Sequence, residues 1–263
     1  MNRFDTRRIL VTGAGSGIGQ ATALRLLREG GRVVAADVVT DGLAKTREIA
    51  ATEGTAERLT TLVVDIADET SAAEGVRTAV AELGGLDVLV NAAGILRTEH
   101  THLTSLDLWN RIITVNLTGT FLVTREALPA LLAGGNGVVV NFSSTSAAFA
   151  HPYMAAYAAS KGGIQSFTHA LALEYGKQGL RAVNVAPGSI KSGITDATSG
   201  YLPADTDWEL FAKLSPILAT DLESGGAPMA GPDAIAGVVA MLASDDGAFI
   251  TGTEIRVDGG THA

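Results

Sequence analysis

Short runs of apolar residues recur along the chain, and glycine or polar residues follow each of them. Apolar runs bounded by turn residues are typical of buried β-strands. We therefore predict seven strands, at residues 8–12, 32–37, 61–65, 86–90, 137–141, 180–185 and 254–257. No apolar run reaches the roughly 20 residues of a membrane-spanning helix, so the pattern predicts no membrane contact.

Segments rich in Ala, Leu, Glu and Arg separate the predicted strands and are long enough to form helices, for example residues 17–29, 41–53 and 69–83. Wholly apolar strands that alternate with helices indicate a parallel sheet with helices on both faces. The sequence thus predicts the α/β class. We expect a single doubly wound Rossmann-type domain over residues 1–263, with a seven-stranded parallel sheet.

Residues 188–231 break the alternation, because they are rich in Gly, Ser, Thr, Asp and Pro and contain one short predicted helix, at residues 207–213. Long irregular segments inside a compact domain are usually functional or disordered. We interpret this segment as a substrate lid, since Tyr201, Trp208 and Phe211 could cover an apolar ligand. A disordered surface insertion is the alternative.

The composition narrows the possible functions. With 263 residues, of which 46% are hydrophobic, the chain can bury one substantial core. The absence of cysteine excludes disulfides, thiolate metal sites and cysteine nucleophiles. A formal net charge of -9 disfavours nucleic-acid binding, which needs clustered Lys and Arg. We expect a small-molecule partner and, because no apolar signal segment follows the first residues, a cytoplasmic location.

A glycine-rich loop connects the first predicted strand to the first predicted helix. Gly13, Gly17 and Gly19 would allow a tight turn and a close approach of the backbone to a pyrophosphate, which the N–H groups of the helix N-terminus would bind. Taken alone, the loop could also be an ordinary strand-to-helix turn. The loop therefore predicts a dinucleotide site only together with further residues.

Carboxylates follow the next two predicted strands. Asp37 is placed to accept hydrogen bonds from both hydroxyls of an adenosine ribose and would repel a 2′-phosphate, which favours NAD(H) over NADP(H). Asp65 could accept a hydrogen bond from the adenine amino group. Each aspartate could instead be a helix cap or turn residue. Small residues in Asn91-Ala92-Ala93-Gly94 would allow close approach of the cofactor at the fourth strand.

Tyr157 and Lys161 are four residues apart in a predicted helix, so their side chains share one face. A tyrosine phenol has an ordinary pKa of about 10, and proton transfer at neutral pH needs a lower value. Lys161 and the positive charge of oxidised nicotinamide would both stabilise the phenolate. Such a pair also occurs on many solvated helices, so it indicates chemistry only in combination with neighbouring motifs.

The motifs T-G-x-x-x-G-x-G at residues 12–19, N-A-A-G at residues 91–94, a serine after the fifth strand and Y-x-x-x-K at residues 157–161 together resemble the short-chain dehydrogenase/reductase family. The resemblance covers essentially the whole chain. It implies hydride transfer between NAD(H) and a secondary alcohol or ketone. It also implies a catalytic tetrad, which falls on Asn116, Ser144, Tyr157 and Lys161.

Within this resemblance each tetrad residue has an expected role. Tyr157 exchanges the proton of the substrate hydroxyl, Ser144 hydrogen-bonds the reacting oxygen, and Lys161 lowers the tyrosine pKa and holds the nicotinamide ribose. Asn116 would hold an ordered water that links the lysine to solvent. Ser144 is preferred over its neighbour Ser143 because the family serine usually precedes the tyrosine by thirteen residues and because side chains alternate along a strand.

The resemblance also implies the remaining cofactor contacts. The turn at residues 187–192 is similar to the family turn that meets the nicotinamide carboxamide, with serine at position 192 in place of the usual threonine. The complete predicted cofactor set is Gly13, Ser16, Gly17, Ile18, Gly19, Asp37, Asp65, Ile66, Asn91, Ala92, Gly94, Tyr157, Lys161, Pro187, Gly188, Ile190 and Ser192.

Other polar residues receive simpler interpretations. His100 and His102 lack a carboxylate-rich cluster of suitable spacing, so we predict no metal site. His151 could line the substrate pocket, but a surface position is the preferred prediction. The resemblance implies a homo-oligomer, usually a tetramer.

Two alternative functions remain. A 3-oxoacyl-acyl-carrier-protein reductase would share the tetrad but usually takes NADPH and meets an acidic carrier through a basic surface. Asp37 and the acidic composition argue against it. A dinucleotide sensor without turnover commonly lacks the tyrosine or the lysine, and this chain has both Tyr157 and Lys161.

Overall fold

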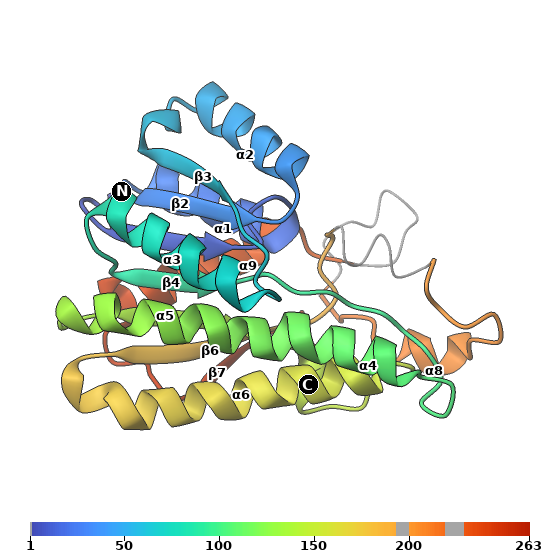
Figure 1. Ribbon diagram of the computed structural model, residues 1–263. Coiled ribbons are helices and arrows are strands. Elements are labelled where there is room, and N and C mark those ends of the chain that lie inside the picture. The colour runs from blue at the N-terminus through green and yellow to red at the C-terminus, as the bar shows by residue number, and fades with distance from the viewer. Residues whose placement is uncertain (1, 193–199, 219–228) are drawn as a thin grey trace.

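A computed structural model describes residues 2–192, 200–218 and 229–263. It confirms the predicted α/β class as one domain around a seven-stranded parallel sheet, with strand order β3-β2-β1-β4-β5-β6-β7 (Figure 1). The strands are β1 Arg8–Thr12, β2 Arg32–Asp37, β3 Leu59–Val63, β4 Val88–Asn91, β5 Val138–Phe142, β6 Arg181–Pro187 and β7 Glu254–Val257.

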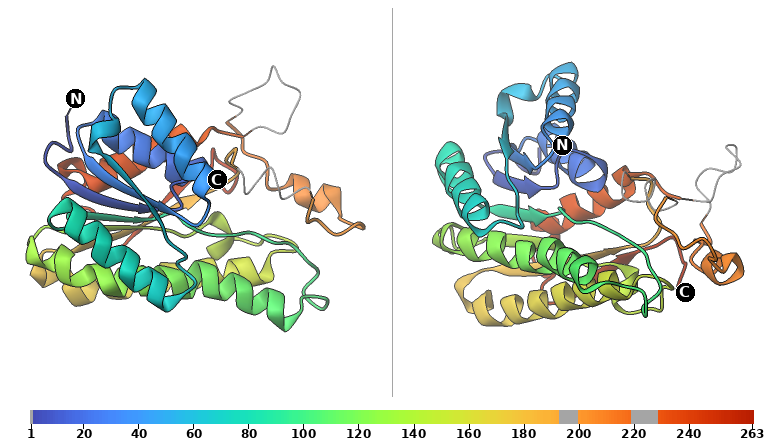
Figure 2. Two further views of the ribbon diagram at one scale, coloured as in Figure 1. Left: turned by 45° about the horizontal axis from the view of Figure 1, so that its top comes forward. Right: turned by 45° about the vertical axis from the view of Figure 1, so that its right-hand side comes forward.

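Helices cover both faces of the sheet, as two further views show (Figure 2). One face packs against α1 Gly17–Arg28, α2 Thr40–Thr52 and α9 Pro232–Ala243. The other packs against α3 Glu69–Leu83, α5 Gly119–Ala133 and α6 Ala155–Tyr175. Two shorter helices, α4 Leu106–Ile113 and α8 Trp208–Ala212, lie near the carboxyl ends of the strands.

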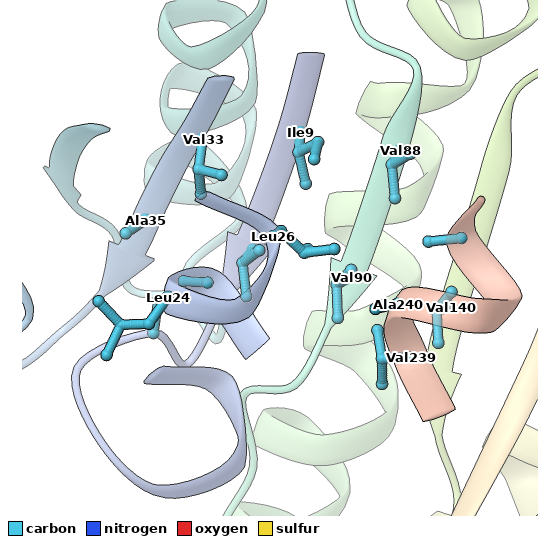
Figure 3. Close-up of a cluster of buried hydrophobic side chains, with 14 of the residues drawn as sticks. Ile9, Leu24, Leu26, Val33, Ala35, Val88, Val90, Val140, Val239 and Ala240 are labelled. Atoms are coloured by element: carbon cyan, nitrogen blue, oxygen red, sulfur yellow. The ribbon is translucent and has the colours of Figure 1, made fainter. Parts of the chain in front are cut away.

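Side chains of the central strands are buried alternately on the two faces. Ile9 and Val11 of β1 belong to the cluster under α1 and α9, whereas Leu10 belongs to the cluster under α3 and α5. Figure 3 shows the first cluster, in which Leu26 of α1 lies among the strand valines and Val239 of α9. Burial on both faces explains why the strands are continuous apolar runs in the sequence.

The predicted boundaries are correct for some elements and shifted for others. The strand predicted at 61–65 is β3 Leu59–Val63, so Asp65 lies in the turn beyond the strand. The short helix predicted at 207–213 is α8, and the Asp207 side chain accepts a hydrogen bond from the Leu210 N–H as its N-cap. Of the lid segment 188–231, residues 193–199 and 219–228 lie outside the described residues.

A chain of buried amides joins two central strands to the helices that cover them. Asn91 of β4 and Asn141 of β5 are register partners, and Asn91 Nδ2 donates to Asn141 Oδ1 at 2.9 Å. Asn91 Nδ2 also donates to Thr124 of α5, and Asn141 Nδ2 donates to Thr168 of α6. These bonds fix both helices against the sheet near the carboxyl ends of its strands.

Leu26 provides a test of this packing, because its side chain is fully buried between α1 and the sheet. Leu26→Ala should lower the free energy of unfolding by about 2–5 kcal/mol, through lost apolar contact and the cavity that remains. Urea denaturation followed by circular dichroism measures the change. Leu106→Ala is the matched control, since Leu106 is 71% exposed. Equal effects of the two substitutions would contradict the packing described here.

Candidate active site

A cavity of about 870 Å³ opens at the carboxyl ends of the strands. Such a volume is in the usual range of small-molecule sites. The predicted residues that line it are Gly13, Ser16, Gly17, Ile18, Gly19, Asp37, Asp65, Ile66, Ala92, Gly94, Ser144, Tyr157, Lys161, Pro187, Gly188, Ile190 and Ser192. Asn91 and Asn116 lie behind the wall rather than on it, because both are buried and neither contributes to the lining.

The glycine loop is shaped so that side chains are excluded from it. Gly13 has a φ of 69°, and a Cβ there would lie 2.6 Å from the backbone nitrogen of Ala93. A Cβ on Gly19 would overlap the carbonyl oxygen of Gly13. The backbone of Ser16 is extended and α1 begins at Gly17, so the unpaired N–H groups of the helix N-terminus meet the cavity. This cradle fits a pyrophosphate.

Asp37 both forms a turn and contributes to the cavity wall. Its Oδ2 accepts a hydrogen bond from the Gly15 N–H at 2.8 Å, and its Oδ1 accepts one from the Val39 N–H at 2.9 Å. A carboxylate has acceptor sites for about four hydrogen bonds, so two remain for ribose hydroxyls. Asp65 similarly accepts the Ala67 N–H in a turn while it lines the cavity.

Ser144, Tyr157 and Lys161 come together at one side of the cavity. Ser144 follows β5 and Tyr157 lies in the first turn of α6, and the Ser144 hydroxyl lowers the pKa of the Tyr157 phenol. Lys161 Nζ lies 5.6 Å from the centre of the Tyr157 ring. The lysine also donates a hydrogen bond to the carbonyl of Phe142 at 2.8 Å.

The neighbouring serine and tyrosine have other partners. Ser143 directs its hydroxyl to the carboxylate of Glu254 on β7. Tyr153 accepts a hydrogen bond from the Asp207 N–H, so its hydroxyl contacts the segment before α8. The structure therefore pairs Ser144 with Tyr157.

Burial shifts the pKa values of Tyr157 and Lys161 in opposite directions. It raises the pKa of the Tyr157 phenol to about 12, although the hydrogen bond from Ser144 lowers it. It lowers the pKa of the Lys161 amine to about 8. Without a bound ligand the phenol is therefore protonated at neutral pH. A cationic ligand beside it would favour the phenolate.

Asn116 lies in a π-helical turn, Thr114–Thr118, between α4 and α5. Its Oδ1 accepts the Ile95 N–H at 2.8 Å, and its Nδ2 donates to the Ile95 carbonyl at 2.9 Å and to Ser160 Oγ at 3.1 Å. The side chain thus links the loop after β4 to α6. Single π-turns within helices are frequent at functional sites. The water-holding role of Asn116 stays a prediction.

The turn after β6 lies beside the glycine loop that follows β1. A Cβ on Gly17 would lie 3.1 Å from the Cβ of Ser192, so the glycine loop and the turn after β6 approach each other. Gly188 packs closely on Asp258, where a Cβ would lie 2.7 Å from the aspartate Cβ. The cavity is thereby enclosed from the side of β6.

Several lining residues were not predicted from the sequence. The preferred surface position for His151 is wrong, because this residue lines the cavity. Of the three aromatic residues in the predicted lid, Phe211 contributes to the lining, whereas Tyr201 and Trp208 do not. Leu214 and Met229 line the cavity from the predicted lid segment, and the newly found lining residues include Val38, Leu96, Asn110, Arg111 and Thr145. They come from separate elements, and no local motif marks them.

Within residues 2–192, 200–218 and 229–263, no group of three His, Cys, Asp or Glu side chains is arranged to hold a metal ion. None of the helices in those ranges is long and apolar enough to cross a membrane.

Comparison with known proteins identifies close relatives. A family model described as short chain dehydrogenase matches residues 7–200. The chain is 39% identical to a probable short-chain type dehydrogenase/reductase of Bradyrhizobium diazoefficiens over 274 residues, covering 100% of this chain and 90% of the relative. It is 35% identical to the cyclohexanol dehydrogenase of Acinetobacter sp. over 260 residues, covering 98% of this chain and 96% of the relative. The crystal structure of a dehydrogenase/reductase from Sinorhizobium meliloti superposes with a TM-score of 0.85 at 29% identity, covering 100% of this chain and 98% of that one.

The buried amine of Lys161 predicts a dependence of stability on pH. The unfolded amine keeps its proton up to about pH 10.5, whereas the folded one loses it near pH 8. The unfolded state therefore binds more protons between these values, and the free energy of unfolding rises with pH. Between pH 8 and 10.5 the ligand-free wild-type protein should gain about 3 kcal/mol relative to Lys161→Met.

Urea denaturation across this pH range measures the difference. Lys177→Met serves as the control, because Lys177 is exposed and its removal should leave the pH dependence unchanged. If Lys161→Met and the wild type differ by the same free energy at every pH, the amine is not desolvated as described.

Proposed function

The chain belongs to the short-chain dehydrogenase family, and on this premise we propose that it is an NAD(H)-dependent oxidoreductase that interconverts a secondary alcohol and a ketone. One observation carries the proposal. Ser144 and Tyr157, with Lys161 beside the tyrosine ring, share a cavity with the glycine loop and Asp37. The acid/base group and the dinucleotide cradle therefore face the same space.

The cavity residues fit a dinucleotide. The glycine loop would hold the pyrophosphate, Asp37 would accept the ribose hydroxyls, and Asp65 with Ile66 would border the adenine. The turn at residues 187–192 would meet the nicotinamide. We propose no cofactor contact for Asn91, since it does not line the cavity and its side chain is buried against Thr124 and Asn141.

The protein side chains supply the proton transfer. During oxidation, the Tyr157 phenolate accepts the proton of the substrate hydroxyl, while the Ser144 hydroxyl donates a hydrogen bond to the same oxygen. Lys161 lowers the free energy of the phenolate by its charge. The bound nicotinamide supplies the acceptor for the hydride that leaves the carbinol carbon. The reaction converts alcohol and NAD⁺ into ketone, NADH and one proton, and reduction runs through the same residues in reverse.

The described lining suggests an uncharged substrate. The lining residues from segments 142–157, 187–190 and 211–214 carry no charge at neutral pH and combine apolar side chains with hydroxyl groups, whereas the cations Arg111 and Lys161 line other parts of the cavity. We include residues 188–231 in the proposal as a substrate lid. Phe211 and Leu214, which line the cavity from this segment, support that assignment.

We further propose a cytoplasmic homotetramer, as the family resemblance implies. Exposed apolar side chains on the two long helices support association, since Phe121 of α5 is 41% exposed and Leu173 of α6 is 87% exposed.

Two observations favour an NAD(H)-dependent alcohol oxidoreductase over a 3-oxoacyl-acyl-carrier-protein reductase. Asp37 lies at the cavity wall, where its charge would repel the 2′-phosphate of NADPH. The formal net charge of -9 also disfavours contact with an acidic carrier protein. Retention of Tyr157 and Lys161 argues against a sensor without turnover.

Tyr157→Phe tests the proton transfer. Loss of the phenol should reduce kcat by about 100-fold to 10000-fold, because general acid/base catalysis contributes on that order. NADH binding, measured by nicotinamide fluorescence, should be largely retained. Tyr153→Phe is the matched control and should retain turnover, since that hydroxyl contacts Asp207. Turnover by Tyr157→Phe at the wild-type rate would rule out the assigned role.

Asp37→Asn tests the cofactor assignment and keeps the shape of the side chain. The wild-type enzyme should prefer NAD(H) over NADP(H) by at least about 100-fold in kcat/KM, since like charges in contact cost several kcal/mol. The variant should lose most of this preference. Parallel assays of secondary alcohols and ketones with both cofactors, followed by nicotinamide absorbance, measure both ratios. A wild-type preference for NADPH would overturn the assignment.

A further inference from the structure

His151 brings an imidazole ring to the cavity wall. It precedes α6 and lines the same cavity as Met154 and Tyr157. Its Nε2 lies 3.2 Å from Thr145 Oγ1 and 3.3 Å from Nε2 of His262. One edge of the ring is therefore held by two polar partners.

The C-terminal segment fixes the second partner. The ring of His262 stacks on Phe149, with centroids 4.2 Å apart and planes 2° from parallel. The backbone N–H of His262 donates to Asp258 Oδ2 at 3.3 Å, and the Arg256 guanidinium lies 5.0 Å from the centre of the Phe149 ring. His151 is thus oriented by a packed set of side chains from the loop after β5 and the segment after β7.

The other ring nitrogen of His151, Nδ1, makes no hydrogen bond with any described residue. Burial and the neighbouring His262 lower the pKa of His151 to about 4, so the ring is neutral at physiological pH. A neutral imidazole offers either a donor or an acceptor at Nδ1, depending on the tautomer. A hydroxyl group matches both cases because it can donate and accept. A carboxylate, which only accepts hydrogen bonds, matches one of the two tautomers only.

The position of His151 relates this nitrogen to the reacting oxygen. Thr145, which contacts the imidazole, directly follows Ser144 in the chain. Ser144, Thr145, His151 and Tyr157 all line the same cavity. A substrate that reaches Ser144 and Tyr157 therefore shares this space with the imidazole.

We propose that His151 is a substrate-binding residue that selects diols, by hydrogen-bonding through Nδ1 to a second hydroxyl of the substrate. This inference rests on the proposed function and specifies its substrate class. In the reaction one C–H and one O–H bond of the diol break, the hydride passes to NAD⁺ and the proton to Tyr157. The products are a hydroxyketone and NADH, and the second hydroxyl is unchanged.

The experiment compares matched substrates with the full-length enzyme and NAD⁺. The probes are 2,3-butanediol against 2-butanol, and 1,2-cyclohexanediol against cyclohexanol. The wild type should favour the diol of each pair by roughly tenfold in kcat/KM, as expected for one hydrogen bond to a buried group. A ratio near one in both pairs would overturn the inference.

Two isosteric variants separate the ring nitrogens. In His151→Asn the amide takes the place of Nδ1, so the diol preference should be largely retained. In His151→Gln the amide takes the place of Nε2, so contact with Thr145 is kept and the preference should fall to near one. The readout in each variant is the ratio of kcat/KM for the diol to kcat/KM for the monohydric alcohol, and NADH binding measured by nicotinamide fluorescence reports that the proteins fold. A preference retained in His151→Gln, or equal losses with diol and monohydric substrates, would assign His151 a structural role only.

The outcomes also distinguish the two proposals. Turnover of monohydric alcohols without a diol preference would overturn the role of His151 and leave the proposed function standing. Lack of turnover with every alcohol and with the corresponding ketones and NADH would overturn both.

Discussion

The parallel alignment of the strands is the constraint on which the site depends. Because every strand runs in the same direction, the loops after β1 to β6 leave the sheet at one edge. The same geometry places the N-terminus of α1 at that edge, where its free N–H groups meet the cavity. A cradle for anionic groups and the side chains that follow each strand are therefore brought together by topology, before any particular contact forms.

Buried polar contacts then fix individual groups at this edge. The amides of Asn91 and Asn141 join β4 and β5 to the helices α5 and α6. Asn116 joins the loop after β4 to α6 through Ile95 and Ser160. As a result α6, which carries the tyrosine and the lysine, is held against the end of β5. Such preorganisation is what proton transfer at a defined oxygen requires.

The same arrangement has a cost in stability. Lys161 is 5% exposed, and burial disfavours its charged form. Its ammonium is directed to the Phe142 carbonyl and lies beside the Tyr157 ring. A buried amine and a buried phenol respond strongly to a charged ligand, since burial lowers the effective dielectric constant around them. Burial therefore both lowers the stability of the folded protein and makes the two ionisable side chains sensitive to a charged ligand.

Local patterns in the sequence determined the fold and many of the residues that are predicted to bind the cofactor. Apolar runs identified all seven strands, because burial on both faces leaves no polar alternation. The ends of the strands do not follow from composition. The strand β3 ends two residues before Asp65, because hydrogen bonds of the following turn decide where strand pairing stops. The glycine loop was recognisable because a close backbone approach excludes side chains at fixed positions such as Gly13 and Gly19.

Only the tertiary structure decided which further residues line the cavity where a substrate would bind. His151 was expected at the surface, since a single histidine in a loop carries no periodic signal. It lines the cavity because Thr145 and His262, which is 111 residues away in sequence, meet it in space. Asn91 belongs to a local motif, yet its side chain faces Thr124 and the neighbouring strand rather than the cavity. Sequence spacing defines which residues share a strand end or a helix face, whereas contacts between distant segments define what a substrate meets.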